Sequence, residues 1–104
     1  MGEEARFTSV AETLGSGDGT TRARMFGAPG LKVRGKVFAC LVTGRLVVKL
    51  PRTRVDALVA AGEAERFDPG MGRLMKEWAA VPPRDDGAWL RLAAEARDFV
   101  ATGQ

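Results

Sequence analysis

Residues 36–50 read KVFACLVTGRLVVKL, two mainly apolar runs joined by Thr43 and Gly44. The first run is apolar at both alternating sets of positions, which is typical of a central strand covered on both faces of its sheet. A connection of only two residues favours an antiparallel hairpin over a crossover, because a crossover needs many more residues. We therefore expect residues 36–42 and 45–50 to be paired strands at the centre of a sheet.

Further strands are expected on both sides of this hairpin. Basic and apolar residues alternate over residues 22–25 and again over residues 31–34, and this alternation has the period of a strand. Residues 74–81 are predicted to be a last strand. Residues 63–68 are ambiguous, with Phe67 expected to point inward from an edge segment. Turns with positive φ, which glycine tolerates, are expected at Gly27, Gly30, Gly35 and Gly44.

Three stretches have the apolar periodicity of an amphipathic helix. The first covers residues 3–14. The second covers residues 52–61, where Thr53 and Asp56 resemble a capping box. The third follows residues 85–86, whose aspartates can cap it. Its apolar face is the clearest periodic signal in the chain and consists of Trp89, Leu92, Ala93, Ala96, Phe99 and Val100.

These elements predict an α+β fold with two layers. An antiparallel sheet of about five strands carries three helices on one side, in the approximate order α-β-β-β-β-α-β-α. The chain has 104 residues, which fits one domain over residues 1–104.

The composition excludes several classes of protein and site. Hydrophobic residues make up 45% of the chain and charged residues 28%, as in a folded protein, and no apolar stretch approaches the length of a membrane helix. The chain has no His and one Cys, so the commonest general base, the commonest metal ligand and any intrachain disulfide are missing. We expect no catalytic residue, cofactor or metal. The N-terminal sequence lacks the pattern of a secretory signal, so we expect a cytoplasmic location.

Charge is distributed very unevenly along the chain. Residues 19–55 contain no Asp or Glu and carry a formal charge of +9, whereas the remainder carries −6. If the basic side chains shared one sheet face, they would form a surface for an anion or a nucleic acid. They could equally be solvated positions that guard the sheet edges. The basic residues are Arg22, Arg24, Lys32, Arg34, Lys36, Arg45, Lys49, Arg52 and Arg54.

Two weaker candidates lie nearer the C-terminus. The loop around Gly70, Gly72 and Arg73 could cradle an anion with its backbone N–H groups, or it could be an ordinary turn. A pocket near Arg73, Lys76 and Trp78 could hold a small anionic ligand, although methionines and tryptophans are more often core residues.

Cys40 lies in the most apolar strand, where a thiol is unreactive. The acidic pairs Glu3–Glu4, Glu63/Glu65 and Asp85–Asp86 lie near expected helix starts or in loops. Capping and helix-dipole roles explain them better than acid–base catalysis.

The order of several motifs resembles the TfoX/Sxy N-terminal domain family. The matching runs are Arg24-Met25-Phe26-Gly27, Gly30-Leu31-Lys32-Val33, Gly35-Lys36-Val37-Phe38-Ala39, Leu46-Val47-Val48-Lys49, and Met75-Lys76-Glu77-Trp78 before Pro82, with Trp89 in the terminal helix. YjbR-like domains share part of this layout and are the second choice. The resemblance implies a two-layer α+β fold and an association with regulators of natural competence, which act with a transcription activator on DNA. It supplies no catalytic residues. Those full-length regulators have a second helical domain, so we expect a single-domain member here.

Three functional hypotheses follow. The first is a non-enzymatic regulatory or interaction module whose basic sheet region contacts DNA or a DNA-bound protein. The second is a small anionic-ligand binder or enzyme that uses the pocket near Arg73, Lys76 and Trp78. The third is a homodimer formed through a sheet edge or a helix face.

Overall fold

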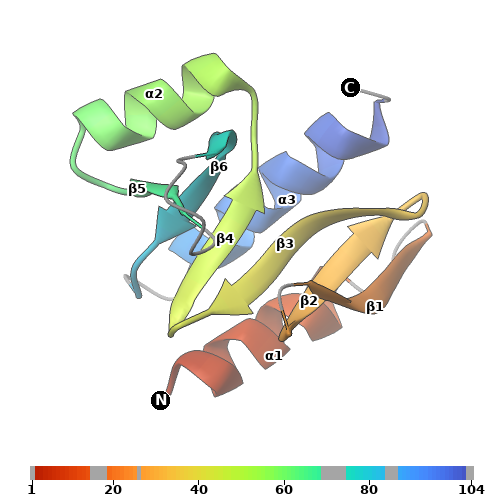
Figure 1. Ribbon diagram of the computed structural model, residues 1–104. Helices are drawn as coiled ribbons and strands as arrows, with labels where there is room; N and C mark the ends of the chain where they lie inside the picture. The colour runs from red at the N-terminus through yellow and green to blue at the C-terminus, as the bar shows by residue number, and fades with distance from the viewer. Residues whose placement is uncertain (1, 15–18, 26, 69–74, 84–86, 103–104) are drawn as a thin grey trace.

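The computed structural model describes residues 2–14, 19–25, 27–68, 75–83 and 87–102. These residues form three helices and six strands, and Figure 1 shows their arrangement. The α+β class and the element order are as expected from the sequence, with a short edge strand in the region left ambiguous. In chain order the elements are α1 (Glu3–Leu14), β1 (Thr20–Met25), β2 (Ala28–Val33), β3 (Lys36–Val42), β4 (Arg45–Lys49), α2 (Arg52–Ala60), β5 (Glu65–Phe67), β6 (Met75–Val81) and α3 (Ala88–Ala101).

The six strands form one antiparallel sheet in the order β1-β2-β3-β4-β6-β5. The first four strands follow one another as a meander, because their connections are too short for a crossover. Helix α2 then carries the chain past the position of β6, so that β5 forms the far edge and β6 returns between β4 and β5 (Figure 1). The sheet therefore has two edges, β1 at one end and β5 at the other.

The main core lies between the sheet and the helices. Apolar residues of all three helices join one face of strands β2, β3, β4 and β6 in a single buried cluster. Trp89 of α3 is fully buried there, and its indole Nε1 donates a hydrogen bond to the carbonyl oxygen of Pro82 at 3.1 Å. A bulge in β3 adds to this core: Leu31 pairs with Ala39 but Lys32 with Val37, so Phe38 is an extra residue and is buried in the same cluster as Ala39.

A second, smaller cluster lies on the other face of the sheet. Its members are Cys40, Val47, Phe67, Trp78 and Ala80. Cys40 and Val47 are paired across β3 and β4, and Val47 is paired with Ala80 in β6, so the cluster runs across the middle of the sheet. The central strands are thus buried on both faces, as the continuous apolar run of residues 36–42 predicted.

The two ends of the second helix are closed in different ways. Helix α2 begins at Arg52 after Pro51, and it has no side-chain capping bond, so the proposed capping box of Thr53 with Asp56 is wrong. At the other end Gly62 has φ +74°, and its N–H bonds to the carbonyl of Val59 while the next N–H bonds to that of Leu58. These two bonds close the C-terminal end of the helix around a glycine with positive φ.

Gly30 does not serve the purpose that the sequence suggested. Gly27, Gly35 and Gly44 have positive φ, whereas Gly30 lies inside β2 without it. A Cβ atom at Gly30 would meet the carbonyl oxygen of Ala39 at 3.0 Å and the Cβ of Cys40 at 3.3 Å. Glycine is needed here because β2 approaches β3 closely. Asp85 and Asp86, the expected caps of the last helix, lie outside the described residues.

Candidate anion-binding surface

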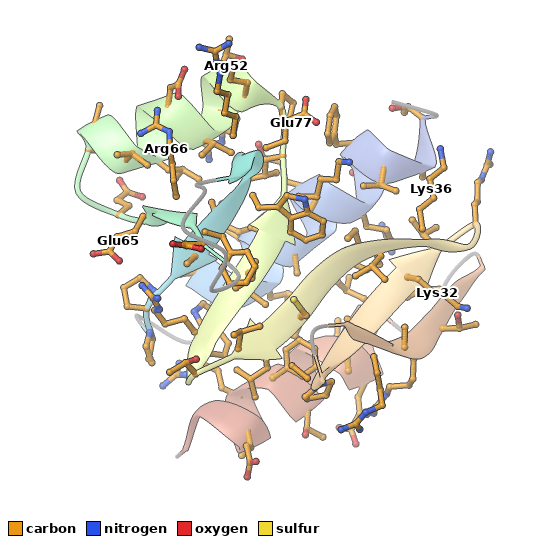
Figure 2. The ribbon with its side chains drawn as sticks, in the orientation of Figure 1. Lys32, Lys36, Arg52, Glu65, Arg66 and Glu77 are labelled. Carbon is orange, nitrogen blue, oxygen red and sulfur yellow. The ribbon has the colours of Figure 1, made fainter. Side chains whose placement is uncertain are left out.

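The β2–β3 hairpin concentrates basic side chains at one end of the sheet. Val33 pairs with Lys36, and the two residues between them, Arg34 and Gly35, have φ values of +53° and +80°. Positive φ at both central residues is the mark of a type I′ turn, which matches the twist of the flanking strands. The tight turn places Lys32, Arg34 and Lys36 at one end of the hairpin, with Lys36 on the helix side of the sheet and Lys32 on the opposite face. Figure 2 shows Lys32 and Lys36 at this end of the hairpin.

Strand β1 adds two arginines beside this hairpin. Arg22 pairs with Leu31 and Arg24 with Pro29, and both arginines are exposed. The Arg24 guanidinium Nη2 also donates a hydrogen bond to the carbonyl oxygen of Gly27 at 3.3 Å. Because Leu31 belongs to the main core, its partner Arg22 lies on the helix side of the sheet, at the outer margin of that layer.

These five basic residues have no carboxylate partner in the part of the chain that the structure describes. We call them the cationic surface. They lie within residues 19–55, a segment without any Asp or Glu. The cationic surface consists of Arg22, Arg24, Lys32, Arg34 and Lys36.

The other four basic residues of the segment are paired within the domain. Arg45 lies 2.7 Å from Glu65 and Lys49 lies 4.0 Å from Glu77, both within the sheet. Figure 2 shows Glu65 on β5 and Glu77 on β6, away from the hairpin that carries Lys32 and Lys36.

Helix α2 holds the remaining two pairs. Arg52 lies 4.0 Å from Asp56 one turn later in the helix, and Arg54 lies 2.8 Å from Glu95 in α3. The nine basic residues therefore do not act as one field. Four of them have a carboxylate within 4.0 Å, with Asp56 shared between Arg52 and Arg66, and the five of the cationic surface have none among the described residues.

The pairing could be read from the sequence in only one case. Arg52 and Asp56 are four residues apart, a spacing that places side chains together on a helix. Arg45 and Glu65 are 20 residues apart, and Arg54 and Glu95 are 41 apart, so only the tertiary fold brings them together.

The second candidate site is only partly described. Gly70, Gly72 and Arg73 lie outside the described residues, so the anion loop stays a prediction. Of the proposed pocket, Lys76 is exposed and Trp78 is 6% exposed. The Lys49 ammonium lies 5.9 Å from the centre of the Trp78 ring, so a cation of the domain itself already contacts this indole.

Among the described residues, the side chains that could perform covalent or metal chemistry are not assembled into a site. Cys40 is fully buried, and burial raises the pKa of its thiol from 9.0 to about 12. A thiol in this state is protonated at neutral pH and is a poor nucleophile. Within the described ranges, no three His, Cys, Asp or Glu side chains gather in a way that could hold a metal ion. No helix in these ranges is long and apolar enough to cross a membrane.

Comparison with known families now places the chain. The model of the TfoX N-terminal domain matches residues 12–100, which is most of the sequence. The chain belongs to the TfoX N-terminal domain family. No curated protein matches it closely enough to count as a relative. Membership confirms the resemblance drawn from the motifs, and the YjbR-like alternative is not needed.

The motifs of this TfoX N-terminal domain have clear structural places. Lys36 to Ala39 opens β3 and includes its bulge, and Met75 to Trp78 opens β6. Trp89 anchors α3 in the main core. Most of the motif residues therefore have a role in the fold. Arg24 and Lys36 are exposed and belong to the cationic surface, and Lys76 and Glu77 are exposed motif positions outside it.

Proposed function

We propose that this TfoX N-terminal domain is a non-enzymatic regulatory module that binds an anionic macromolecule through the cationic surface. The observation that carries the proposal is the contrast between two sets of basic residues in one acid-free segment. Four have a carboxylate of the domain within 4.0 Å, and the five of the cationic surface have none among the residues that the structure describes. Clustered cations without internal partners produce a field that attracts a polyanion.

The chemistry of the described residues supports a binding role over an enzymatic one. The chain has no His, and the thiol of Cys40 is buried with a raised pKa. The family of competence regulators supports a regulatory role. The partner that we propose is therefore an anionic surface of a regulator or the nucleic acid that such a regulator occupies.

Two variants with equal charge test the proposal on a heparin column, where heparin stands in for any polyanion. K32Q/R34Q/K36Q removes three residues of the cationic surface, and R45Q/R52Q/R54Q removes three that are already paired. Both lower the formal net charge of +3 by three. The first variant should elute at clearly lower salt than the wild type, and the second close to it, with circular dichroism confirming that both are folded.

Net charge alone would shift both variants equally, and that result would overturn the proposal. Failure of the wild-type domain to bind heparin at low salt would overturn it as well.

Duplex DNA of mixed sequence is then tested as one specific polyanion. Contacts to phosphates release counterions, so affinity for DNA should fall steeply between ~50 and ~200 mM salt. The K32Q/R34Q/K36Q variant should show a shallower dependence than R45Q/R52Q/R54Q, because it makes fewer phosphate contacts.

A further inference from the structure

Strand β1 is an edge of the sheet with an open outer side. It has six residues, pairs with β2 on its inner side, and no other described strand pairs with it (Figure 1). Exposed edges of this kind offer unpaired backbone groups to another strand.

The turn between β2 and β3 determines the direction of the backbone groups. Val33 and Lys36 flank a two-residue type I′ turn, so they form the hydrogen-bonded pair that closes the hairpin. Val33 therefore directs its N–H and C=O toward β3. The preceding residue, Lys32, directs its groups to the opposite side, toward its partner Thr21 in β1.

The direction of the backbone N–H and C=O groups alternates from residue to residue along β1. Because Thr21 is bonded to β2, so are the residues two and four positions further on, and the residues between them direct their N–H and C=O away from the sheet. Thr20 is only 5% exposed, so the outer side of β1 offers two N–H groups and two C=O groups to a new strand. The residues that carry them are Arg22 and Arg24.

The other edge of the sheet is closed to such a partner by its length and its contacts. Strand β5 has only three residues, and its pairing with β6 contains a register shift. Glu65 is bonded to Arg45, and Arg66 is bonded to Asp56 of α2. The long, open edge is therefore β1 alone among the described strands.

The side chains on β1 select the charge of the partner. Arg22 and Arg24 have outward backbone groups and exposed guanidinium groups without a carboxylate partner among the described residues. A second copy of β1 pairing antiparallel would place arginines opposite arginines, which is destabilising. A neutral strand would leave both guanidinium groups without a partner, whereas an acidic strand would supply one for each.

We propose, as a specific form of the proposed function, that β1 is the docking edge for an extended acidic segment of a partner protein. The segment adds a seventh, antiparallel strand, and its backbone bonds to Arg22 and Arg24. Acidic residues two positions apart face Arg22 and Arg24, because residues directly opposite each other share a face of the sheet. The intervening residues are small or apolar, since they lie on the face that carries Thr21 and Ala23.

The test uses a fluorescent peptide in which Glu alternates with Val and Thr, measured by anisotropy with the whole domain. We expect this peptide to bind and a peptide with Gln in place of Glu to bind at least tenfold more weakly. A third peptide keeps its charge but carries N-methyl groups on the Glu amides, which removes the N–H groups that would face β1. Loss of these bonds should weaken binding by about tenfold or more.

Two protein variants separate backbone pairing from charge. Arg22→Gln removes the guanidinium group, and Arg22→Pro also removes an outward N–H that no β2 residue uses. Proline is tolerated at such edge positions, so the fold should survive, and the unfolding midpoint in urea checks this. Arg22→Pro should bind the peptide several-fold more weakly than Arg22→Gln.

These measurements distinguish strand addition from ionic contact alone. Equal binding of the N-methylated peptide, or equal binding by the two Arg22 variants, would show ionic contact without strand addition and would overturn this inference. Binding to heparin and DNA but not to the acidic peptide would also overturn it while leaving the proposed function intact. Failure on heparin, DNA and peptide together would overturn both.

Discussion

The two ends of the sheet differ in whether their basic side chains have carboxylate partners. Around β1 and the β2–β3 hairpin, the five residues of the cationic surface have no described carboxylate partner, whereas around β4, β5 and α2 the four basic residues of the same acid-free segment are all paired. A block of charge in the sequence is thus divided by the fold into a neutralised part and an available part. The proposed function rests on the available part only.

The two ends also differ in packing. Around β4 and β6, buried side chains cover both faces of the sheet, because the smaller apolar cluster lies opposite the main core. Around β1, the face away from the helices carries exposed Thr21 and half-buried Ala23 and Lys32. The end that is free to bind is therefore held mainly by its backbone ladder and by one apolar face.

Truncation of Trp78 should have the largest effect on stability. Trp78 is 6% exposed and belongs to the smaller cluster, so Trp78→Ala should lower the free energy of unfolding by about 3–5 kcal/mol. Thr21→Ala, on the same face at the other end of the sheet, should change it by less than about 0.5 kcal/mol. Urea unfolding followed by far-UV circular dichroism measures both, and similar losses for the two variants would contradict the packing difference.

Cys40 lies in β3, between the two ends of the sheet, and the reactivity of its thiol tests how completely this strand is buried. Burial raises the pKa of its thiol from 9.0 to about 12, so at pH 8 the folded domain should contain about 10³-fold less thiolate than the unfolded chain. Reaction with a thiol reagent should be correspondingly slow until denaturant is added. Comparable rates of thiol reaction in the folded and unfolded states would show that the reagent reaches Cys40 in the folded domain through the smaller apolar cluster.

The raised pKa of the Cys40 thiol makes the stability of the domain depend on pH. The folded-state pKa lies above the unfolded value, so the contribution of Cys40 to stability is fully present below about pH 9 and is lost as the pH rises toward about 12. A Cys40→Ala variant, which cannot titrate, should lose less stability than the wild type over this alkaline range.

Sequence patterns predicted the fold well where periodicity is local. The helix at residues 3–14, the hairpin at residues 36–50 and the apolar face of α3 follow from spacings of two, three and four residues. Phe67 was correctly placed at an edge, although the three-residue strand around it is too short to show a period. The role of Gly30 was mistaken because a close approach of two strands leaves no mark on the local sequence.

The candidate site was less predictable for a physical reason. The sequence shows which residues are charged, but the pairing of Arg45 with Glu65 and of Arg54 with Glu95 depends on contacts across 20 and 41 residues. The outward backbone groups of Arg22 and Arg24 were missed as well. They follow from the strand order and the turn geometry, and only the strand order reveals that β1 is an edge.

Each end of the sheet has a hairpin turn in which a substitution can relieve an unfavourable positive φ. Arg34 and Thr43 have φ values of +53° and +54° in two-residue turns, a conformation that Asn tolerates far better. Thr43→Asn should stabilise the domain by about 1 kcal/mol, because a β-branched residue is the more strained of the two. Arg34→Asn should stabilise it slightly less and also lower the salt at which the domain elutes from heparin. Thr43→Asn should leave that elution unchanged, and a shift equal to that of Arg34→Asn would contradict the division of charge.

The smallest expected effect is the coupling between Arg54 and Glu95, the pair that joins α2 to α3. The guanidinium Nε lies 2.8 Å from the carboxylate, but both side chains are about 40% exposed, so solvent screens their attraction. A double-mutant cycle with Arg54→Ala and Glu95→Ala should give about 0.5 kcal/mol at low salt and less at 1 M salt.

The control for this cycle combines Arg34→Ala with Glu95→Ala. Arg34 has no carboxylate partner among the described residues, so the two substitutions should be additive. A coupling for this control as large as that of the paired residues would mean that Arg34 is also neutralised by long-range charge. The distinction between the paired and the available ends of the sheet would then fail, and the cationic surface would lose the property on which the proposed binding rests.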